Sequence, residues 1–248
     1  MSKSQFQIAR ATTREFLRHK NITNHNFYGP VSDQYWNEPF RVVAVNMDSY
    51  GYPDLYEMDC NELIRWLNDA GHTRTKTARY TLAILTLLLA RVIHGKHPSR
   101  EDFTAAFRDK VLLEQTLDRT VYYNIRPESN QNKEQDFAAI AAVGASELGA
   151  LLWSEIQAFD PHVVIVSGVA GLAALNGCAK LNPALHFRKQ IVSQDGFLIQ
   201  SIAHPSRPNY TTSCSMIDGI GNWVSEIEQG RETKRLPSVD HPITTVKP

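Results

Sequence analysis

Several common signatures are absent from this 248-residue chain, and each absence excludes a class of protein. Its three cysteines, Cys60, Cys178 and Cys214, stand apart with no CxxC pair, which argues against a disulfide framework and favours a reducing, cytoplasmic location. No HxxxH or HExxH spacing occurs, so we expect no metal and no cofactor. The most apolar run, 80–90, has roughly half the length that spans a bilayer, so we expect a buried helix and no membrane partner.

Charge is balanced, because 26 lysine and arginine residues are matched by 26 aspartate and glutamate residues. A charged partner therefore cannot be inferred from the net charge, and local charge has to be examined instead. Between Asp69 and Glu101 no acidic residue occurs. The basic residues in this span are Arg74, Lys76, Arg79, Arg91, Lys96 and Arg100. A solvated helix face and a phosphate-facing surface both explain this segment.

Alternating strand and helix patterns predict an α/β protein. Strands are predicted over 41–45, 120–125, 163–166, 187–192 and 196–203. Helices are predicted near 6–20, over 60–70 and 77–94, after Ser99, over 133–159 with a break near Gly144 or Gly149, and over 172–181 and 215–229. We therefore expect a three-layer α/β/α sandwich with a central, mainly parallel four-stranded sheet. Residues 1–230 would form a single domain with a helical basic segment at about 60–117, and 231–248 a loose tail.

A carboxylate follows the first predicted strand directly. In open parallel sheets, ligands bind outside the carboxyl ends of the strands, which is where Asp48 is expected. A carboxylate held there could orient a water molecule and stabilise a positively charged, sugar-like transition state, as the cleavage of a glycosidic bond requires. A loop carboxylate that caps a nearby amide is the alternative explanation.

Two further polar residues are predicted at strand ends. His204 precedes Pro205, which restrains it to extended backbone, and its imidazole could donate to a leaving group that departs as an anion. Asn124 follows Tyr123, and its amide offers both a donor and an acceptor for a nucleobase edge. A histidine bonded to a carbonyl and a turn-forming asparagine are the structural alternatives.

Hydroxyl groups accompany these residues. Ser206 follows Pro205, and Ser167 begins a Ser-Gly-Val-Ala-Gly turn into a predicted helix, where backbone amides favour anions such as phosphate. Because Gly-x-x-Gly turns are common in α/β proteins, this motif is weak by itself.

Three of these segments together resemble the uracil-DNA glycosylase superfamily. Residues 47–51, Met-Asp-Ser-Tyr-Gly, stand where the family has a Gln-Asp-Pro-Tyr-His or Asn-Pro-Gly loop. Residues 122–124, Tyr-Tyr-Asn, match the family strand that ends in a base-binding asparagine. Residues 204–207, His-Pro-Ser-Arg, match His-Pro-Ser-Pro in three of four positions. The order and spacing agree from about residue 40 to residue 210, which covers most of the chain.

The resemblance implies a hydrolase that flips a nucleotide out of DNA and cleaves its N-glycosidic bond to leave an abasic site. It implies that Asp48 positions water and that His204 stabilises the departing base. The base-binding residues that it implies are Asn124, Tyr50, Tyr52, Tyr56 and Asn46. The residues implied to hold phosphates or to wedge the duplex are Ser49, Ser167, Ser206, Arg207 and Tyr210. DNA is the expected partner, and no obligate protein partner is evident.

The chain departs from the family within these motifs. Ser49 replaces a proline and Gly51 replaces a histidine, which makes the water-side loop looser and smaller, and Arg207 replaces the second proline of the wedge loop. The four cluster-binding cysteines of some relatives are absent, so no iron–sulfur cluster is expected. A smaller loop could admit a bulkier base, such as the glucosylated 5-hydroxymethylcytosine of phage DNA, with antiviral defence as the role. Uracil removal in base-excision repair is the alternative.

Two other functions fit the same sequence: a non-catalytic nucleic-acid-binding module that keeps the fold, and a hydrolase of free nucleosides. A kinase does not fit, because no Gly-x-x-x-x-Gly-Lys-Ser/Thr loop occurs. None of the three motifs contains a lysine, so we predict simple hydrolysis without a covalent amine intermediate.

Overall fold

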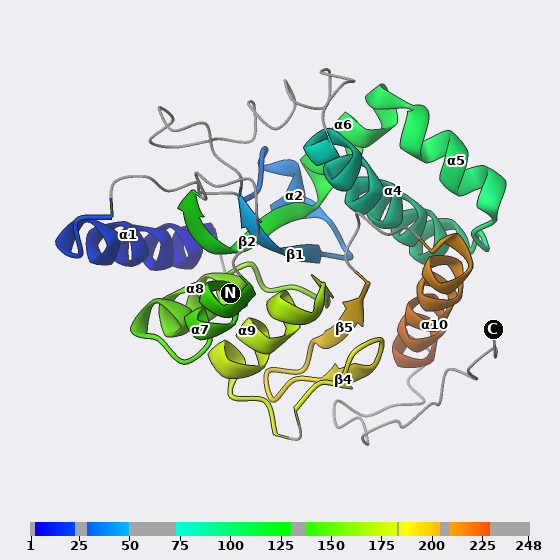
Figure 1. The fold of residues 1–248 in the computed structure, drawn as a ribbon. Coiled ribbons are helices and arrows are strands. Elements are labelled where there is room, and N and C mark those ends of the chain that lie inside the picture. The colour runs from blue at the N-terminus through cyan, green and yellow to red at the C-terminus, as the bar shows by residue number, and fades with distance from the viewer. Residues whose placement is uncertain are drawn as a thin grey trace.

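The computed structural model describes residues 3–22, 29–49, 73–129, 137–182, 184–203 and 209–228 (Figure 1). At positions 48–49, 73–76, 127–129 and 228 it describes the course of the backbone alone. The predicted helix over 60–70 and the predicted tail over 231–248 lie outside these residues.

Within this part of the chain, a five-stranded sheet has the strand order β2-β1-β3-β5-β4 (Figure 1). The strands are β1 (Val42–Ser49), β2 (Val121–Ser129), β3 (Val163–Ser167), β4 (Gln190–Val192) and β5 (Leu198–Ile202). Neighbouring strands are parallel, apart from β4, which runs antiparallel to β5. The predicted α/β class with a mainly parallel sheet is confirmed. The sheet has five strands rather than the predicted four, because the predicted strand over 187–192, observed as β4, folds back on β5 as a hairpin and joins the edge.

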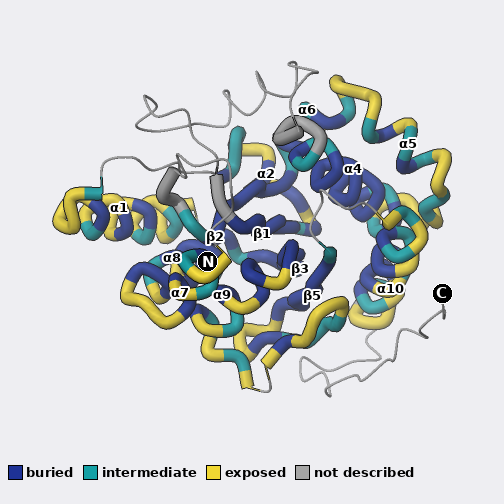
Figure 2. Tube along the Cα trace, viewed as in Figure 1, coloured by how far each residue is buried: buried dark blue, intermediate teal, exposed yellow. Residues whose placement is uncertain are grey.

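Helices cover both faces of the sheet. Successive residues of a strand point to opposite faces, and each face has its own hydrophobic cluster that needs cover from solvent. In β1, Val42 and Ala44 belong to one cluster and Val43 and Val45 to the other. The helices on the first face are α4 (Thr73–His94), α5 (Arg100–Arg108), α6 (Lys110–Arg119) and α10 (Tyr210–Glu228). Those on the second are α1 (Lys3–His19), α2 (Gln34–Asn37), α7 (Phe137–Val143), α8 (Glu147–Ala158) and α9 (Val169–Ala179). Figure 2 shows the strands as buried between them, an arrangement compatible with the predicted three-layer sandwich.

The most apolar helix, α4, is a core helix, as its sequence predicts. By length and composition alone it could cross a membrane, but Leu82, Leu85 and Leu88 are fully buried in the cluster beneath the sheet. The next helix, α5, begins where Ser99 predicts. The Ser99 hydroxyl accepts from the Asp102 N–H at 3.0 Å, and the Asp102 carboxylate accepts from the Ser99 N–H at 3.1 Å.

The predicted long helix over 133–159 is broken near Gly144, as expected. Its two parts, α7 and α8, are bent by 69° relative to one another. Ser146 caps α8 by accepting from the Gly149 N–H at 3.1 Å. A Cβ atom at Gly144 would lie 2.5 Å from the carbonyl oxygen of Ala174, so α9 packs directly against the break.

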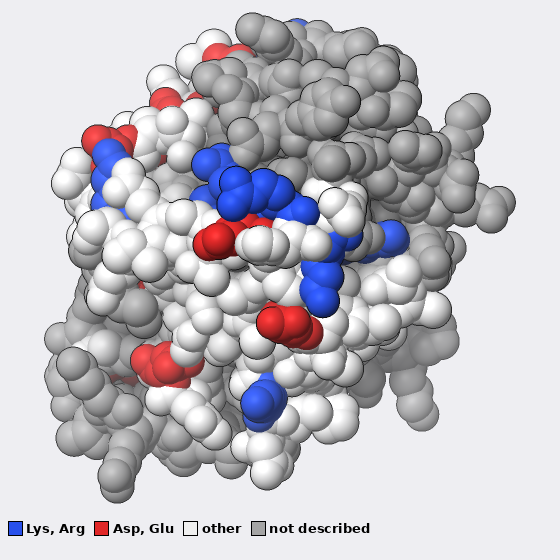
Figure 3. Space-filling view, turned by 90° about the vertical axis from the view of Figure 1, so that its left-hand side faces the viewer, with Lys and Arg blue, Asp and Glu red and all other residues white. Residues whose placement is uncertain are grey.

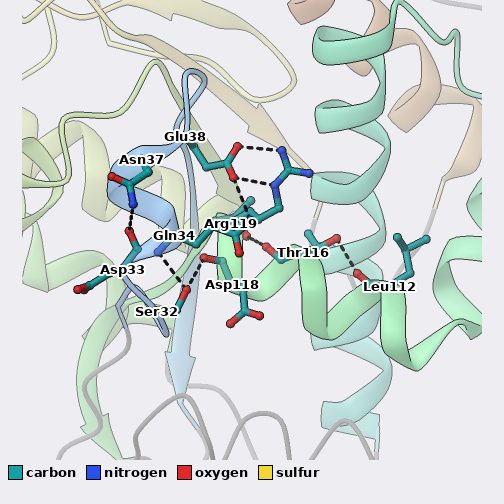
Figure 4. A network of polar contacts seen from close by, with 10 residues as sticks. Ser32, Asp33, Gln34, Asn37, Glu38, Leu112, Thr116, Asp118 and Arg119 are labelled. Atoms are coloured by element: carbon teal, nitrogen blue, oxygen red, sulfur yellow. Dashed lines mark hydrogen bonds and ion pairs between the residues drawn. The ribbon is translucent and has the colours of Figure 1, made fainter.

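A bidentate ion pair joins the segments that enter β1 and β2 (Figure 4). Glu38, four residues before β1, accepts from the Nε and Nη2 atoms of Arg119 at 2.8 Å each, and Arg119 lies two residues before β2. The Glu38 side chain is 7 % exposed, and the hydrogen bond from Arg119 lowers the pKa of its carboxyl group. Ser32 adds a bond of 3.2 Å to the carbonyl of Asp118. These contacts fix the entry of the two strands that carry the site residues described below.

Candidate functional site

Polar residues form a row across three neighbouring strands, near the carboxyl ends of β1 and β3. Asn46 of β1 pairs in register with Asn124 of β2. On the other side of β1, Val45 pairs with Val166, which places Ser167 of β3 level with Asn46. Asn46 and Asn124 are each 5 % exposed, and Ser167 is 2 % exposed. The sheet therefore buries three polar side chains at one level.

Asn46 is held in place by two hydroxyl groups. The Ser167 Oγ atom lies 3.0 Å from Asn46 Oδ1, and the Oγ1 atom of Thr81, on α4, lies 3.4 Å from the same oxygen. Ser167 was predicted to hold a phosphate, but its hydroxyl points into the sheet and bonds Asn46. The structure therefore makes Ser167 a positioning residue for Asn46, because a hydroxyl already spent on a buried neighbour cannot reach an external anion.

Two atoms of this row have no hydrogen-bond partner within the described residues. They are Nδ2 of Asn46 and Oδ1 of Asn124, and both are shielded from solvent. A buried polar atom without a partner costs about 1–3 kcal/mol, so native proteins seldom leave one unexplained. Because the two atoms come from register partners on adjacent strands, one ligand edge could satisfy both.

The strands that carry Asp48 and Asn124 are longer than predicted. β1 runs on to Ser49, so Asp48 lies inside the strand, in register with Arg126, and the bulge falls between Asp48 and Ser49. β2 runs on to Ser129, so Asn124 lies in mid-strand rather than at its end. The prediction that both residues mark strand ends is corrected accordingly. Asp48 remains two residues beyond Asn46, towards the carboxyl end of β1.

The turn after β3 closes against β5. Ser167 pairs with Ile202, and the N–H of Gly168 donates to the Ile202 carbonyl at 3.0 Å. Gly168 has φ +75°, and a Cβ atom there would lie 2.8 Å from the sulfur of Met47, so a side chain is excluded on both grounds. This turn locks the end of β5 beside β3, two residues before His204 in the sequence.

A pocket that the sequence did not predict lies at the end of β5, between α4 and α10. Tyr80 of α4 bonds across it, with its hydroxyl 2.8 Å from Ser213 Oγ and accepting from the Asn209 N–H at 3.1 Å. Burial raises the pKa of the Tyr80 hydroxyl. The residues around the pocket are Tyr80, Arg188, Gln200, Ile202, Ala203, Asn209, Thr212, Ser213 and Met216. No sequence motif marks it, because its walls come from four separate segments.

Tyr210, predicted as a wedge, makes packing contacts at the start of α10. It is the first residue of α10, and its half-buried ring meets Phe103 edge-on at 5.0 Å between centroids. The guanidinium of Arg100 lies 5.6 Å from the centre of the same ring. The ring therefore packs between α5 and α10, and its role as a wedge stays a prediction.

Eight predicted site residues are placed only in part or not at all. Asp48 and Ser49 are described by their backbone alone. The others lie outside the described residues: Tyr50, Tyr52, Tyr56, His204, Ser206 and Arg207. Their predicted roles stay predictions.

Part of the basic segment is committed to internal contacts. Arg91, 8 % exposed, donates to Asp218 at 3.1 Å and to Asn222 at 2.7 Å on α10. Lys96 donates to Asp102 at 2.6 Å. Arg91 therefore joins α4 to α10 and is not available to a phosphate, while Lys96 ties the loop after α4 to the first turn of α5.

The second basic element, α1, presents charges of both signs. Arg14, Arg18 and Lys20 are exposed, and Glu15 lies 3.9 Å from Arg18 and 3.5 Å from His19. Figure 3 faces the side of the molecule on which α1 lies and shows lysine and arginine side chains gathered beside acidic ones. This mixture does not single the face out as a surface for nucleic acid. Within the described ranges, no group of three or more His, Cys, Asp or Glu side chains is placed to hold a metal ion.

No protein-family model matches the chain, and no curated protein matches it. The candidate site is therefore interpreted from its own geometry, together with the motif resemblance.

Proposed function

We propose that the protein is a monofunctional DNA glycosylase of the uracil-DNA glycosylase type. It would flip a modified or damaged base out of DNA and hydrolyse the N-glycosidic bond, leaving an abasic site. Asp48 acts on the sugar side, His204 on the base side, and Asn124 reads the polar edge of the base.

One observation supports this proposal: strands β2, β1, β3 and β5 run parallel, so the described ends of the strands that carry the motifs point to one edge of the sheet. Asn124 and Asn46 are level with one another, Asp48 follows two residues later, and β5 ends at Ile202, two residues before His204 in the sequence. Because parallel sheets bind ligands at this edge, we propose that segments separated by about 160 positions in sequence serve one site.

The proposed chemistry uses charge rather than a covalent enzyme intermediate. As the bond between the sugar and the base lengthens, positive charge develops on the sugar and negative charge on the base. The Asp48 carboxylate stabilises the first and orients a water molecule, while His204 donates a hydrogen bond to the second. Water adds to the sugar carbon, the bonding pair leaves with the base, and the water proton is released, so no amine nucleophile is needed.

The substrate that we propose is a hypermodified cytosine, such as the glucosylated hydroxymethyl base of phage DNA, which would make the protein an antiviral factor. Its support comes from the sequence: Gly51 stands where the family has a histidine and Ser49 where it has a proline, and smaller side chains in this loop could admit a bulkier base. Uracil in repair is the competing substrate.

The test is an assay for abasic sites on otherwise identical DNAs that contain uracil, only unmodified bases, or glucosylated 5-hydroxymethylcytosine. We expect product from the glucosylated DNA and none from unmodified DNA. Asp48→Asn should lower the rate by about 10²–10⁴-fold without weakening DNA binding. Asp195→Asn is the matched control, because Asp195 lies in the turn before β5, at the opposite end of that strand from His204.

Other outcomes assign other functions. Product from uracil DNA alone would exclude the modified-cytosine substrate. Cleavage of free nucleosides without DNA would favour a nucleoside hydrolase, and DNA binding without product would favour a non-catalytic module. A borohydride-trapped covalent adduct would contradict the hydrolytic mechanism.

A further inference from the structure

Thr81 extends the polar row at Asn46 and Ser167. These three side chains and the main-chain carbonyls near them contain more acceptors than donated protons, and this shortage determines how the Asn46 amide is turned. Each hydroxyl has one proton, and each lies near a main-chain carbonyl as well as near Asn46. Ser167 Oγ is 3.4 Å from the Val45 oxygen, and Thr81 Oγ1 is 3.2 Å from the Thr77 oxygen. Neither hydroxyl can donate to its carbonyl and to Asn46 at once.

With the amide oxygen turned towards the hydroxyls, its nitrogen faces away with no acceptor within the described residues. The oxygen and nitrogen of an asparagine amide are nearly equal in shape, so exchanging them needs no movement of the backbone. After the exchange, the amide nitrogen donates to Ser167 and Thr81, which in turn donate to their carbonyls. Every proton in the row then has an acceptor, and one carbonyl oxygen alone faces outward.

The outward oxygen of Asn46 then stands beside another. Oδ1 of Asn124, on the neighbouring strand and at the same level, is also buried without a donor in the described part of the chain. Two adjacent carbonyl oxygens repel one another unless a group with two protons lies between them. A primary amino group on an aromatic ring has two such protons and is planar, as the oxygens require.

We propose that Asn46, held by Ser167 and Thr81, is a specificity-determining residue that joins Asn124 in binding the exocyclic amino group of the base. The site would then select an amino-bearing pyrimidine over its 4-oxo counterpart. Uracil presents one ring N–H flanked by two carbonyl oxygens. Its single proton could satisfy only one of the two asparagine oxygens, and a uracil carbonyl oxygen would lie near the other. This inference rests on the proposed function, and it names the chemical feature of the base that the site reads.

The experiment compares 5-hydroxymethylcytosine with 5-hydroxymethyluracil, which differ in the amino or oxo group at C4 and in the proton that the oxo form carries on N3. Each is placed once in the same duplex opposite an abasic analogue, and binding by the full-length Asp48→Asn protein is measured by fluorescence anisotropy. We expect the amino-bearing base to bind about tenfold tighter or more, which corresponds to one buried hydrogen bond. Asn46→Leu should bring this ratio close to one.

Variants of Thr81 separate positioning from folding. Thr81→Val keeps the shape of the side chain but removes the hydroxyl, so it should lower the preference for the amino-bearing base. Thr81→Ser keeps the hydroxyl and should retain the preference. Thr86→Val is the matched control on α4, since Thr86 is buried and bonds Thr116 at 2.7 Å, outside the row.

The outcomes distinguish this inference from the proposed function. Asn46→Leu protein that melts like the wild type but keeps the full preference would overturn the inference alone, as would wild-type preference for the uracil analogue. Failure of the wild type to bind or cleave any of the DNAs would overturn both. Loss of preference in Asn46→Leu and Thr81→Val, with Thr81→Ser and Thr86→Val unaffected, is the supporting result.

Discussion

Removal of the Arg10 charge should expose how strongly α1 depends on a buried ion pair with α8. The Nε atom of Arg10 donates to Glu155 Oε2 at 3.0 Å, and the Tyr123 hydroxyl donates to the same oxygen at 3.0 Å. The Glu155 side chain is fully shielded from solvent, while that of Arg10 is 10 % exposed. In Arg10→Met, a carboxylate stays in the core with its charged partner removed.

The expected loss is about 3–5 kcal/mol in the free energy of unfolding, because an uncompensated buried charge retains its desolvation penalty. The free energy of unfolding of a typical domain is roughly 5–15 kcal/mol, so this loss is a large fraction of it. Urea unfolding at pH 7.5, followed by circular dichroism, measures it through the shift in midpoint at constant slope. The double variant Arg10→Met/Glu155→Met should recover roughly 2 kcal/mol of the loss, since no charge is left buried.

Lys3→Met is the matched control on the same helix. Lys3 pairs with Asp33 at the surface, where the two side chains are 48 % and 73 % exposed, and its removal should cost less than about 1 kcal/mol. If Arg10→Met were as mild as Lys3→Met, the reasoning would be refuted, because the Glu155 carboxylate would then be solvated by another route.

Two further predictions concern pH. The hydrogen bond from Arg119 lowers the pKa of Glu38. The stability that the pair contributes is therefore present above about pH 4.3, the unfolded pKa, and is lost as the pH falls through the folded pKa. Glu38→Gln should cost about 1–3 kcal/mol at pH 7, and urea midpoints of wild type and variant that stay equally far apart at pH 3 would contradict this. Burial, and secondarily the charge of Arg41, lowers the pKa of His162, whose Nδ1 accepts from the Arg41 N–H at 3.1 Å. Stability should therefore fall as the pH drops below about 6.5, the unfolded value, and His162→Asn, which keeps an acceptor, should flatten that part of a melting-temperature profile.

The elements that the sequence predicts best are those that a local residue pattern determines by itself. The apolar run of α4 and the cap at Ser99 each needed only local information. Each of these signals is contained in a short stretch of chain, so it survives without knowledge of the partners.

The ends of β1 and β2 were missed for a physical reason. Beyond Val45, the strand continues through Asn46, and beyond Asn124, β2 continues past Pro127, which an edge strand tolerates. Polar residues and proline are typical of loops, so the pattern predicts that both strands stop. What keeps them extended is their pairing with one another, a contact between segments about 80 residues apart that no local pattern contains.

The contact between Asn46 and Ser167 is harder still to predict, because it depends on strand order. The two residues are 121 positions apart and meet only because β3 lies next to β1. The pocket behind Tyr80 is similar, since it needs α10 to pack on α4. The sequence indicates which polar residues are candidates for the site. It does not indicate which of them bond one another and which keep an unpaired atom for a ligand.

The wrong prediction that the first strand stops before Asn46 is itself informative about the site. A buried strand position normally takes an apolar side chain, and an asparagine there lowers stability unless all its polar atoms are bonded. Asn46 is bonded on one side by Ser167 and Thr81, while its other side faces Asn124 with an atom to spare. We propose that this atom is kept for a ligand, as functional sites often break a local rule that the rest of the fold obeys. Asn46→Leu should then stabilise the unliganded protein while it removes the preference for the base.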